Sequence, residues 1–117
     1  MNTMPPQINY PEILLTVAGE QIFVQIEEIM YLEAKGSYTD IYLADGQKCR
    51  ISKKLKLALK ILNADYFVRI HHSYALNLKY LAGFCNGDSA SVKLKDGSQL
   101  PLSRSRKTDF LSFFKRL

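Results

Sequence analysis

Turn dipeptides divide the chain into short segments, and their positions constrain its fold more than any other feature. Asp45-Gly46 and Asp96-Gly97 each separate two runs of β-forming residues, and Asn86-Gly87-Asp88 does the same. Asn-Gly and Asp-Gly are strong hairpin signals because both central residues of a type I′ turn adopt positive φ. With Ala18-Gly19 and Lys35-Gly36-Ser37, these turns predict about ten short, largely antiparallel strands in small packed sheets.

Two segments follow a helical pattern instead. Apolar residues recur at i, i+3, i+4 and i+7 within residues 52–62, and Ser52 is the expected N-cap of this short helix. A second apolar stripe predicts a C-terminal helix over residues 105–117. The residues expected to be buried are Leu55, Ala58, Leu59 and Leu62 in the first helix and Phe110, Phe113, Phe114 and Leu117 in the second.

Length and composition are those of a single soluble domain. The 117 residues can bury a core, and no apolar run approaches the ~18 residues of a membrane span. Residues 1–11, with Pro5-Pro6, are expected to be a flexible lead-in or the end of a linker, and residues 12–117 to form the domain. Cys49 and Cys85 are both expected to be reduced core thiols in a cytoplasmic protein.

Charge is distributed unevenly along the chain. Residues 1–47 carry seven acidic residues and one basic residue, a balance of −6. Residues 48–117 carry fifteen basic and four acidic residues, a balance of +11, so the whole chain has a net charge of +5. This asymmetry indicates a polyanionic partner, nucleic acid before a membrane surface.

No group of residues predicts an enzyme, a metal site or a cofactor. Neither His71 nor His72 has an acid beside it, and Glu33 has no second carboxylate at a useful spacing. The two cysteines and two histidines lack the close pairs typical of zinc ligands. We therefore expect a binding domain without a cofactor.

Polar and basic residues gather in three segments that are expected to be loops. These are residues 35–38, 69–73 and 103–107. Phosphates are bound by Lys, Arg, hydroxyls and backbone N–H groups, whereas base edges are read by forked side chains such as Arg on guanine. The three segments supply both kinds of group, which favours double-stranded DNA as the partner.

A short internal echo places further basic residues. Residues 43–52 and 94–103 both match L-x-D-G-x4-[IL]-S, and each copy is followed by a basic residue, Lys53 or Arg104. Both are expected near the start of a helix, where backbone N–H groups favour phosphate. Two copies of so short a pattern do not by themselves define a repeat architecture.

Taken in order, these segments resemble the LytTR-type DNA-binding domain of bacterial transcription regulators. The resemblance covers residues 13–117 and rests on residues 29–34, 36–39, 67–77 and 100–104. It implies a mostly β fold with little helix and sequence-specific binding of double-stranded DNA. Members of this family place loops, rather than a recognition helix, into successive major grooves of bent DNA.

The resemblance also implies roles for individual residues. Tyr38 matches the first base-reading loop, His71 and His72 the second, and Arg104 the third. His72 stands where the family often has Arg or Lys, so this loop lacks a permanent charge. The residues expected to contact the DNA backbone are Lys35, Ser37, Lys53, Lys54, Arg69, Ser73, Arg106 and Lys107.

The resemblance implies a response regulator of a two-component system, with a receiver domain upstream in the parent protein, and leaves open a second copy on repeated half-sites. One alternative is an OB-like β-barrel that binds single-stranded nucleic acid, with Tyr31, Tyr38 and Tyr42 as stacking platforms. The other is a β-domain for protein interaction. A membrane partner is not expected.

Overall fold

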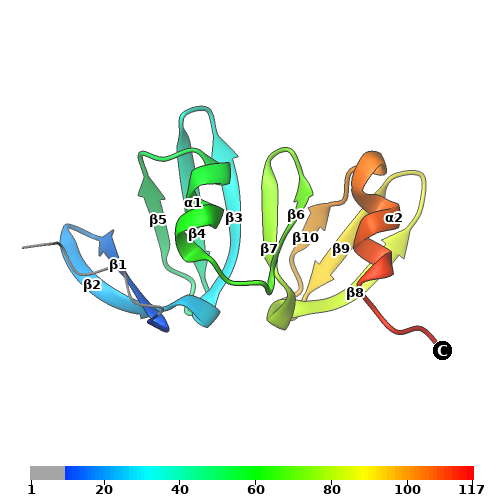
Figure 1. Ribbon diagram of the computed structural model, residues 1–117, viewed down its shortest axis with the longest axis horizontal. Helices are drawn as coiled ribbons and strands as arrows, with labels where there is room; N and C mark the ends of the chain where they lie inside the picture. Colours follow the sequence, from blue (N-terminus) through cyan, green and yellow to red (C-terminus); the bar gives the residue numbers. More distant parts are fainter. Residues whose placement is uncertain (1–9) are drawn as a thin grey trace, which may run out of the picture.

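The computed structural model describes residues 10–117, which form a mostly β fold (Figure 1). The expected number of strands and the antiparallel arrangement are confirmed. The strands are β1 (Glu12–Val17), β2 (Glu20–Gln25), β3 (Ile29–Lys35), β4 (Tyr38–Leu43), β5 (Lys48–Ile51), β6 (Phe67–His71), β7 (Tyr74–Asn77), β8 (Leu81–Asn86), β9 (Ala90–Leu94) and β10 (Gln99–Pro101). The helices are α1 (Leu55–Leu62), α2 (Arg104–Ser112) and the 3-10 turns η1 (Ile26–Glu28) and η2 (Leu78–Tyr80). Most of the predicted lead-in, residues 1–9, lies outside the described residues.

Three antiparallel sheets lie along an elongated molecule of 57 × 31 × 26 Å. The five-stranded sheet, with order β5-β4-β3-β7-β6, occupies the middle (Figure 1). The β1–β2 hairpin lies at one end, and the sheet β10-β9-β8 with α2 lies at the other. No helix in residues 10–117 is long and apolar enough to cross a membrane.

Each half of the molecule has its own hydrophobic core. The first core lies beneath α1 and contains the fully buried Leu32 and the nearly buried Ile41. The second lies beneath α2 and contains Val92 and Phe110. The β6–β7 hairpin joins them, because Ala75 belongs to the first core and the next residue of the strand belongs to the second. Alternating side chains of one strand are thus buried on both faces.

The two halves repeat one unit: hairpin, 3-10 turn, three-stranded meander, helix. The unit spans residues 12–62 and again residues 67–112. Its hydrogen bonds repeat as well. Ile26 N donates to Pro11 O at 2.8 Å where the first hairpin closes, and Leu78 N donates to Tyr66 O at 2.8 Å where the second closes.

The meanders of the two units match in the same way. Gly46 N donates to Leu43 O at 3.0 Å, and Gly97 N donates to Leu94 O at 2.9 Å. Both glycines have positive φ, which the predicted Asp-Gly turns require. The first strand of each meander also carries an irregularity in its pairing at the same place, one residue after its start. The echo seen in the sequence is therefore one part of a duplication that spans nearly the whole fold.

Both predicted helices are shorter than expected. The first begins at Leu55 rather than Ser52, and Lys54 is its N-cap. The Thr39 hydroxyl donates to Lys53 O at 2.7 Å, which ties the preceding segment to β4 in an extended conformation. The predicted Ser52 cap was wrong.

The C-terminal helix ends at Ser112, five residues before the predicted end. The Ser112 hydroxyl donates back to Asp109 O at 2.6 Å, and such local bonds compete with helix continuation. Phe110 is buried as predicted, but Phe113 and Leu117 are exposed. Cys85 is also exposed rather than part of a core, because it points to the opposite face of β8 from Phe84, which packs against the second core; Cys49 is buried as expected.

Candidate nucleic-acid interface

The first predicted loop is the tight turn between β3 and β4. Lys35 and Tyr38 are directly opposed at the strand ends, and Gly36 adopts positive φ between them. Tyr38 is 48% exposed, so its ring is available to a ligand. The Arg50 guanidinium lies 5.9 Å from the centre of that ring, a cation–π arrangement that limits the ring's movement.

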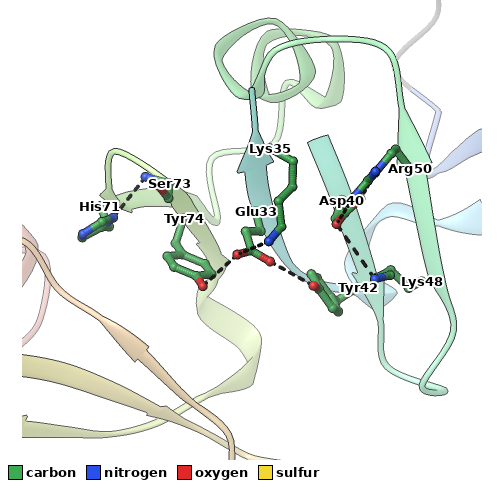
Figure 2. Close-up of polar contacts among 9 residues, drawn as sticks. All are labelled: Glu33, Lys35, Asp40, Tyr42, Lys48, Arg50, His71, Ser73 and Tyr74. Carbon is green, nitrogen blue, oxygen red and sulfur yellow. Dashed lines mark hydrogen bonds and ion pairs between the residues drawn. The ribbon is translucent and has the colours of Figure 1, made fainter. Parts of the chain in front are cut away.

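The second predicted loop is the turn between β6 and β7, and it is braced from within. Arg69 donates from Nε to His71 O at 3.1 Å and from Nη2 to His72 O. The Ser73 amide donates to Nδ1 of His71 at 3.1 Å (Figure 2). With Nδ1 accepting, a neutral His71 carries its proton on Nε2 and can donate there. His72 is exposed beside it, with the two ring centres 4.3 Å apart.

The third predicted segment is the start of α2. Ser103 is the N-cap residue and Arg104 is the first helical residue, exposed to solvent. Arg106 and Lys107 follow and are half-buried. Lys107 donates at 2.5 Å to the side chain of Asn86, the last residue of β8, so its ammonium group already has a partner.

Two backbone hydrogen bonds connect the three segments. Ala34 N, at the end of β3, donates to Ser73 O at 2.7 Å. Ser103 N, at the start of α2, donates to Ile70 O in β6 at 2.8 Å. The β3–β4 turn, the β6–β7 turn and the first residues of α2 therefore lie along one edge, the upper edge in Figure 1.

The basic segment before α1 lies on the same edge (Figure 1). Lys53 and Lys54 are both exposed there. The echo aligns Lys53 with Arg104, although Lys53 precedes α1 and Arg104 is the first residue of α2. All twelve residues that the sequence singled out thus come from four segments at one edge of the molecule.

A polar and aromatic face of the five-stranded sheet lies directly beneath this edge. Glu33 accepts hydrogen bonds from the hydroxyls of Tyr42 at 2.9 Å and Tyr74 at 3.0 Å, and Lys35 lies 3.3 Å from the same carboxylate (Figure 2). These contacts outweigh the effect of partial burial and lower the pKa of the Glu33 carboxyl. Tyr31 stacks on Tyr42 with ring centres 4.3 Å apart.

A second carboxylate on this face was not predicted. Asp40 is fully buried and accepts from Arg50 Nε at 2.7 Å and Nη2 at 3.1 Å, with Lys48 at 4.0 Å (Figure 2). The Arg50 bonds lower the pKa of the Asp40 carboxyl. Because Arg50 also lies against Tyr38, this pair supports the first loop from below. Period-two alternation of Tyr38, Asp40 and Tyr42 was the available signal, but the register with β5 was not readable from the sequence.

The electrostatics of the second loop keep His71 neutral. Burial lowers the pKa of the His71 imidazole, and the neighbouring His72, Arg106 and Arg69 lower it further. Burial and the nearby Arg106 likewise lower the pKa of Arg69. The edge therefore combines a neutral hydrogen-bonding histidine with permanent cations on either side.

Comparison with known proteins identifies the family. The family model described as the LytTr DNA-binding domain matches residues 19–115. One relative is the CO-responsive transcriptional regulator RcoM of Rhodospirillum rubrum, 30% identical over 90 residues, which cover 74% of this chain and 37% of that protein. The fold also resembles a solved LytTr DNA-binding domain of a putative methyl-accepting/DNA response regulator from Bacillus cereus. That match has a TM-score of 0.76 and 22% identity, and covers 88% of this chain and 95% of the other.

The chain belongs to the LytTr DNA-binding domain family. It is a DNA-binding domain of the kind found in bacterial transcription regulators, as the sequence predicted. The single-stranded and protein-interaction alternatives are not favoured. The chain spans little more than a third of the length of the RcoM relative.

Proposed function

We propose that this edge reads double-stranded DNA in the major groove through three segments. Tyr38, His72 and Arg104 contact base edges, and His71 donates from Nε2 to a base or phosphate acceptor. The observation that carries the proposal is the pair of backbone hydrogen bonds, from Ala34 to Ser73 and from Ser103 to Ile70, which fix the three segments relative to one another. Fixed spacing between reading groups is what recognition of a regular duplex requires.

The phosphate contacts come from the same edge. Lys35, Ser37, Lys53 and Lys54 serve the first half of the footprint, and Ser73 and Arg106 serve the second. Lys35 also pairs with Glu33, and its half-exposed ammonium group has donors left for a phosphate. Arg69 and Lys107 contribute differently, since their side chains already hold backbone or side-chain oxygens of the protein. Their role in binding is to position the loops, with phosphate contact only through donors left over.

A duplex fits this site better than a single strand does. Single-strand binding needs aromatic rings open to stacking. Tyr31 and Tyr42 instead stack on each other, and the Tyr42 hydroxyl is held by Glu33. Among the three tyrosines considered, Tyr38 alone is more than a third exposed.

The domain serves a cytoplasmic, non-enzymatic regulator in this proposal. A sensing or receiver domain precedes it in the parent protein, and a second copy occupies a repeated half-site. The length of the RcoM relative, of which this domain matches 37%, supports an additional domain.

The test is selection of duplex sites from a random library, followed by competition between the selected duplex and its separate strands. The duplex should compete far better than either strand. Binding should also depend steeply on salt: if about five phosphates are neutralised, log K against log[salt] has a slope of about −4.5. Equal competition by single strands, or a slope flatter than about −1, contradicts the proposal.

A further inference from the structure

The duplicated fold leaves one hairpin without the neighbour that its counterpart has. In the second unit, β7 pairs on one side with β6 and on the other with β3 of the preceding unit. Within residues 10–117, the equivalent strand β2 pairs with β1 alone. At the other end of the same described range, β8 is the equivalent of β3 and pairs with β9 alone.

The side chains on this unpaired hairpin are apolar where a neighbour would cover them. Ala75 of β7 is fully buried, because it faces the first core across the β7–β3 join. The residue at the same position of β2 is Phe23, which is 66% exposed, and its cross-strand neighbour Leu14 is 48% exposed. An exposed apolar pair of this kind on an edge hairpin is a surface suited to strand addition.

We propose that copies of this domain associate head to tail, with β2 of one copy added to the β8 edge of the next. The β7–β3 join sets the register: Leu32 is opposite Ala75 and Glu33 is opposite Tyr74. Transferred to the equivalent positions, Phe84 lies opposite Phe23 and Cys85 lies opposite Ile22. The join between copies thus repeats the join between units of one chain.

Charge favours a second copy as the occupant and favours this orientation. The first 47 residues carry a balance of −6 and the remaining residues +11. Head-to-tail contact places the acidic end of one copy against the basic end of the next, whereas a symmetric contact between two β2 edges would bring acid against acid. A heterologous contact of this kind is open-ended.

The head-to-tail orientation also agrees with the proposed function. Of the steps in this inference, only this one depends on the proposed function. Both helices of the chain begin at the same edge (Figure 1), so the relation between the two units preserves the DNA-facing side. Copies joined in the same way present their reading edges to one duplex. They would therefore occupy directly repeated half-sites rather than inverted ones.

Disulfide trapping tests the contact without DNA. Protein A carries Ile22→Cys, Cys85→Ser and an affinity tag, and protein B is the untagged wild type with its exposed Cys85. Directly opposed residues of paired strands lie close enough for a disulfide after a small adjustment. When proteins A and B are mixed and oxidised, the disulfide-linked A–B dimer should be several times more abundant than the A–A or B–B dimer.

The matched control replaces protein A by Thr16→Cys with Cys85→Ser, whose thiol lies on the exposed face of β1, away from the β2 edge. This control should give only a statistical mixture. Statistical products from Ile22→Cys as well would overturn the proposal, and the exposed face would then belong to some other partner. Adding Phe23→Lys to protein A should return the excess to the statistical level.

A second measurement tests the contact independently of the Ile22→Cys protein, which could misfold because Ile22 is half-buried. Phe23→Lys alone changes an exposed side chain. It should leave affinity for one half-site unchanged and lose the cooperative gain on two directly repeated half-sites. Unchanged cooperativity in Phe23→Lys would overturn the head-to-tail contact. Absence of any site-specific DNA binding would instead contradict the proposed function, and the disulfide trapping alone would then decide on the contact.

Discussion

The Ser73 amide donates a hydrogen bond to Nδ1 of His71 at 3.1 Å. This bond requires Nδ1 to be unprotonated. It therefore holds the turn between β6 and β7 in the form that exposes His72, and couples the shape of a predicted reading loop to the charge of one imidazole. Burial, His72, Arg106 and Arg69 all lower the pKa of that imidazole.

The first prediction follows from this coupling. An unfolded chain protonates His71 near its ordinary pKa of about 6.5, whereas the folded chain does so only at lower pH. The unfolded state thus binds more protons in this window, so the stabilisation is present above pH ~6.5 and is lost as the pH falls below it. In urea unfolding, the free energy of unfolding should be lower at pH ~5.5 than at pH ~7.5. The His71→Gln variant should show a smaller difference.

The matched control for this experiment is His72→Gln on the exposed neighbour. It removes one of the groups that lower the His71 pKa, so it should retain most but not all of the pH dependence, because burial, Arg106 and Arg69 still act. Measurements stay above pH ~5 because the carboxyls of Asp40 and Glu33, whose pKa values are lowered, titrate in a separate and more acidic range. An equal pH dependence in wild type and His71→Gln would show that His71 is not the titrating group.

The second prediction concerns Arg69, which the sequence assigned to the DNA backbone. Its guanidinium spans two carbonyls of the following turn, His71 O and His72 O. Lysine keeps the charge but lacks the planar pair of N–H donors with which arginine reaches two acceptors at once. Arg69→Lys should therefore lower the free energy of unfolding by about 1–2 kcal/mol, measured in urea, and weaken binding to the selected site. If Arg69 served chiefly as a phosphate contact, stability would be unchanged, as expected for Arg116→Lys at the exposed C-terminus.

The third prediction concerns Asn77, which ends β7 at the junction of the two units. Its side chain is fully buried, donates to Glu27 O at 2.9 Å and Ile29 O at 2.8 Å, and accepts from Lys79 N at 2.9 Å. Asn77→Ala leaves these groups unpaired and should cost about 2–4 kcal/mol of unfolding free energy.

Gln25 supplies the control for Asn77, since it ends β2 at the same position of the first unit. Its amide donates to the Glu12 side chain at 3.0 Å near the surface. Gln25→Ala should cost no more than about 1 kcal/mol, because water replaces the lost partner. Equal losses for the two variants in urea unfolding would contradict the junction role of Asn77.

Local signals in the sequence predicted the strands well. Asp45-Gly46 and Asp96-Gly97 form the turns expected of them, because positive φ at glycine is a property of the dipeptide itself. Helix ends were less predictable: Ser52 has the chemistry of an N-cap, but a hydrogen bond from distant Thr39 to Lys53 O sets the start of α1.

Relations between distant segments were beyond the sequence. Two of the three predicted loops are turns, and the third, residues 103–107, is the start of α2 instead. Nothing in residues 69–73 indicates that Ser73 O meets Ala34 N. The buried pair of Asp40 and Arg50 depends on the register of β4 and β5, which the hydrophobic pattern alone did not fix. For the same reason, the short echo did not reveal the duplication, whose other matches are hydrogen bonds rather than residue identities.

The last prediction concerns Arg104, the first residue of α2. It is exposed, and the bond from Ser103 N to Ile70 O holds its backbone beside the second loop. From this position a guanidinium can form two parallel bonds to O6 and N7 of a guanine, and lysine cannot. Arg104→Lys should keep most non-specific binding but lose discrimination at one base pair by about 1–3 kcal/mol.

The measurement is a binding series over single-base variants of the selected site. Lys53→Ala is the matched comparison, because it removes an exposed charge at the corresponding place before α1. It should weaken all site variants alike and reduce the salt slope by about 1. The Arg104 effect should instead concentrate at one position, since the fork, and not the charge, is what the substitution removes. Uniform weakening by Arg104→Lys would make Arg104 a phosphate contact and would leave base reading to Tyr38 and His72.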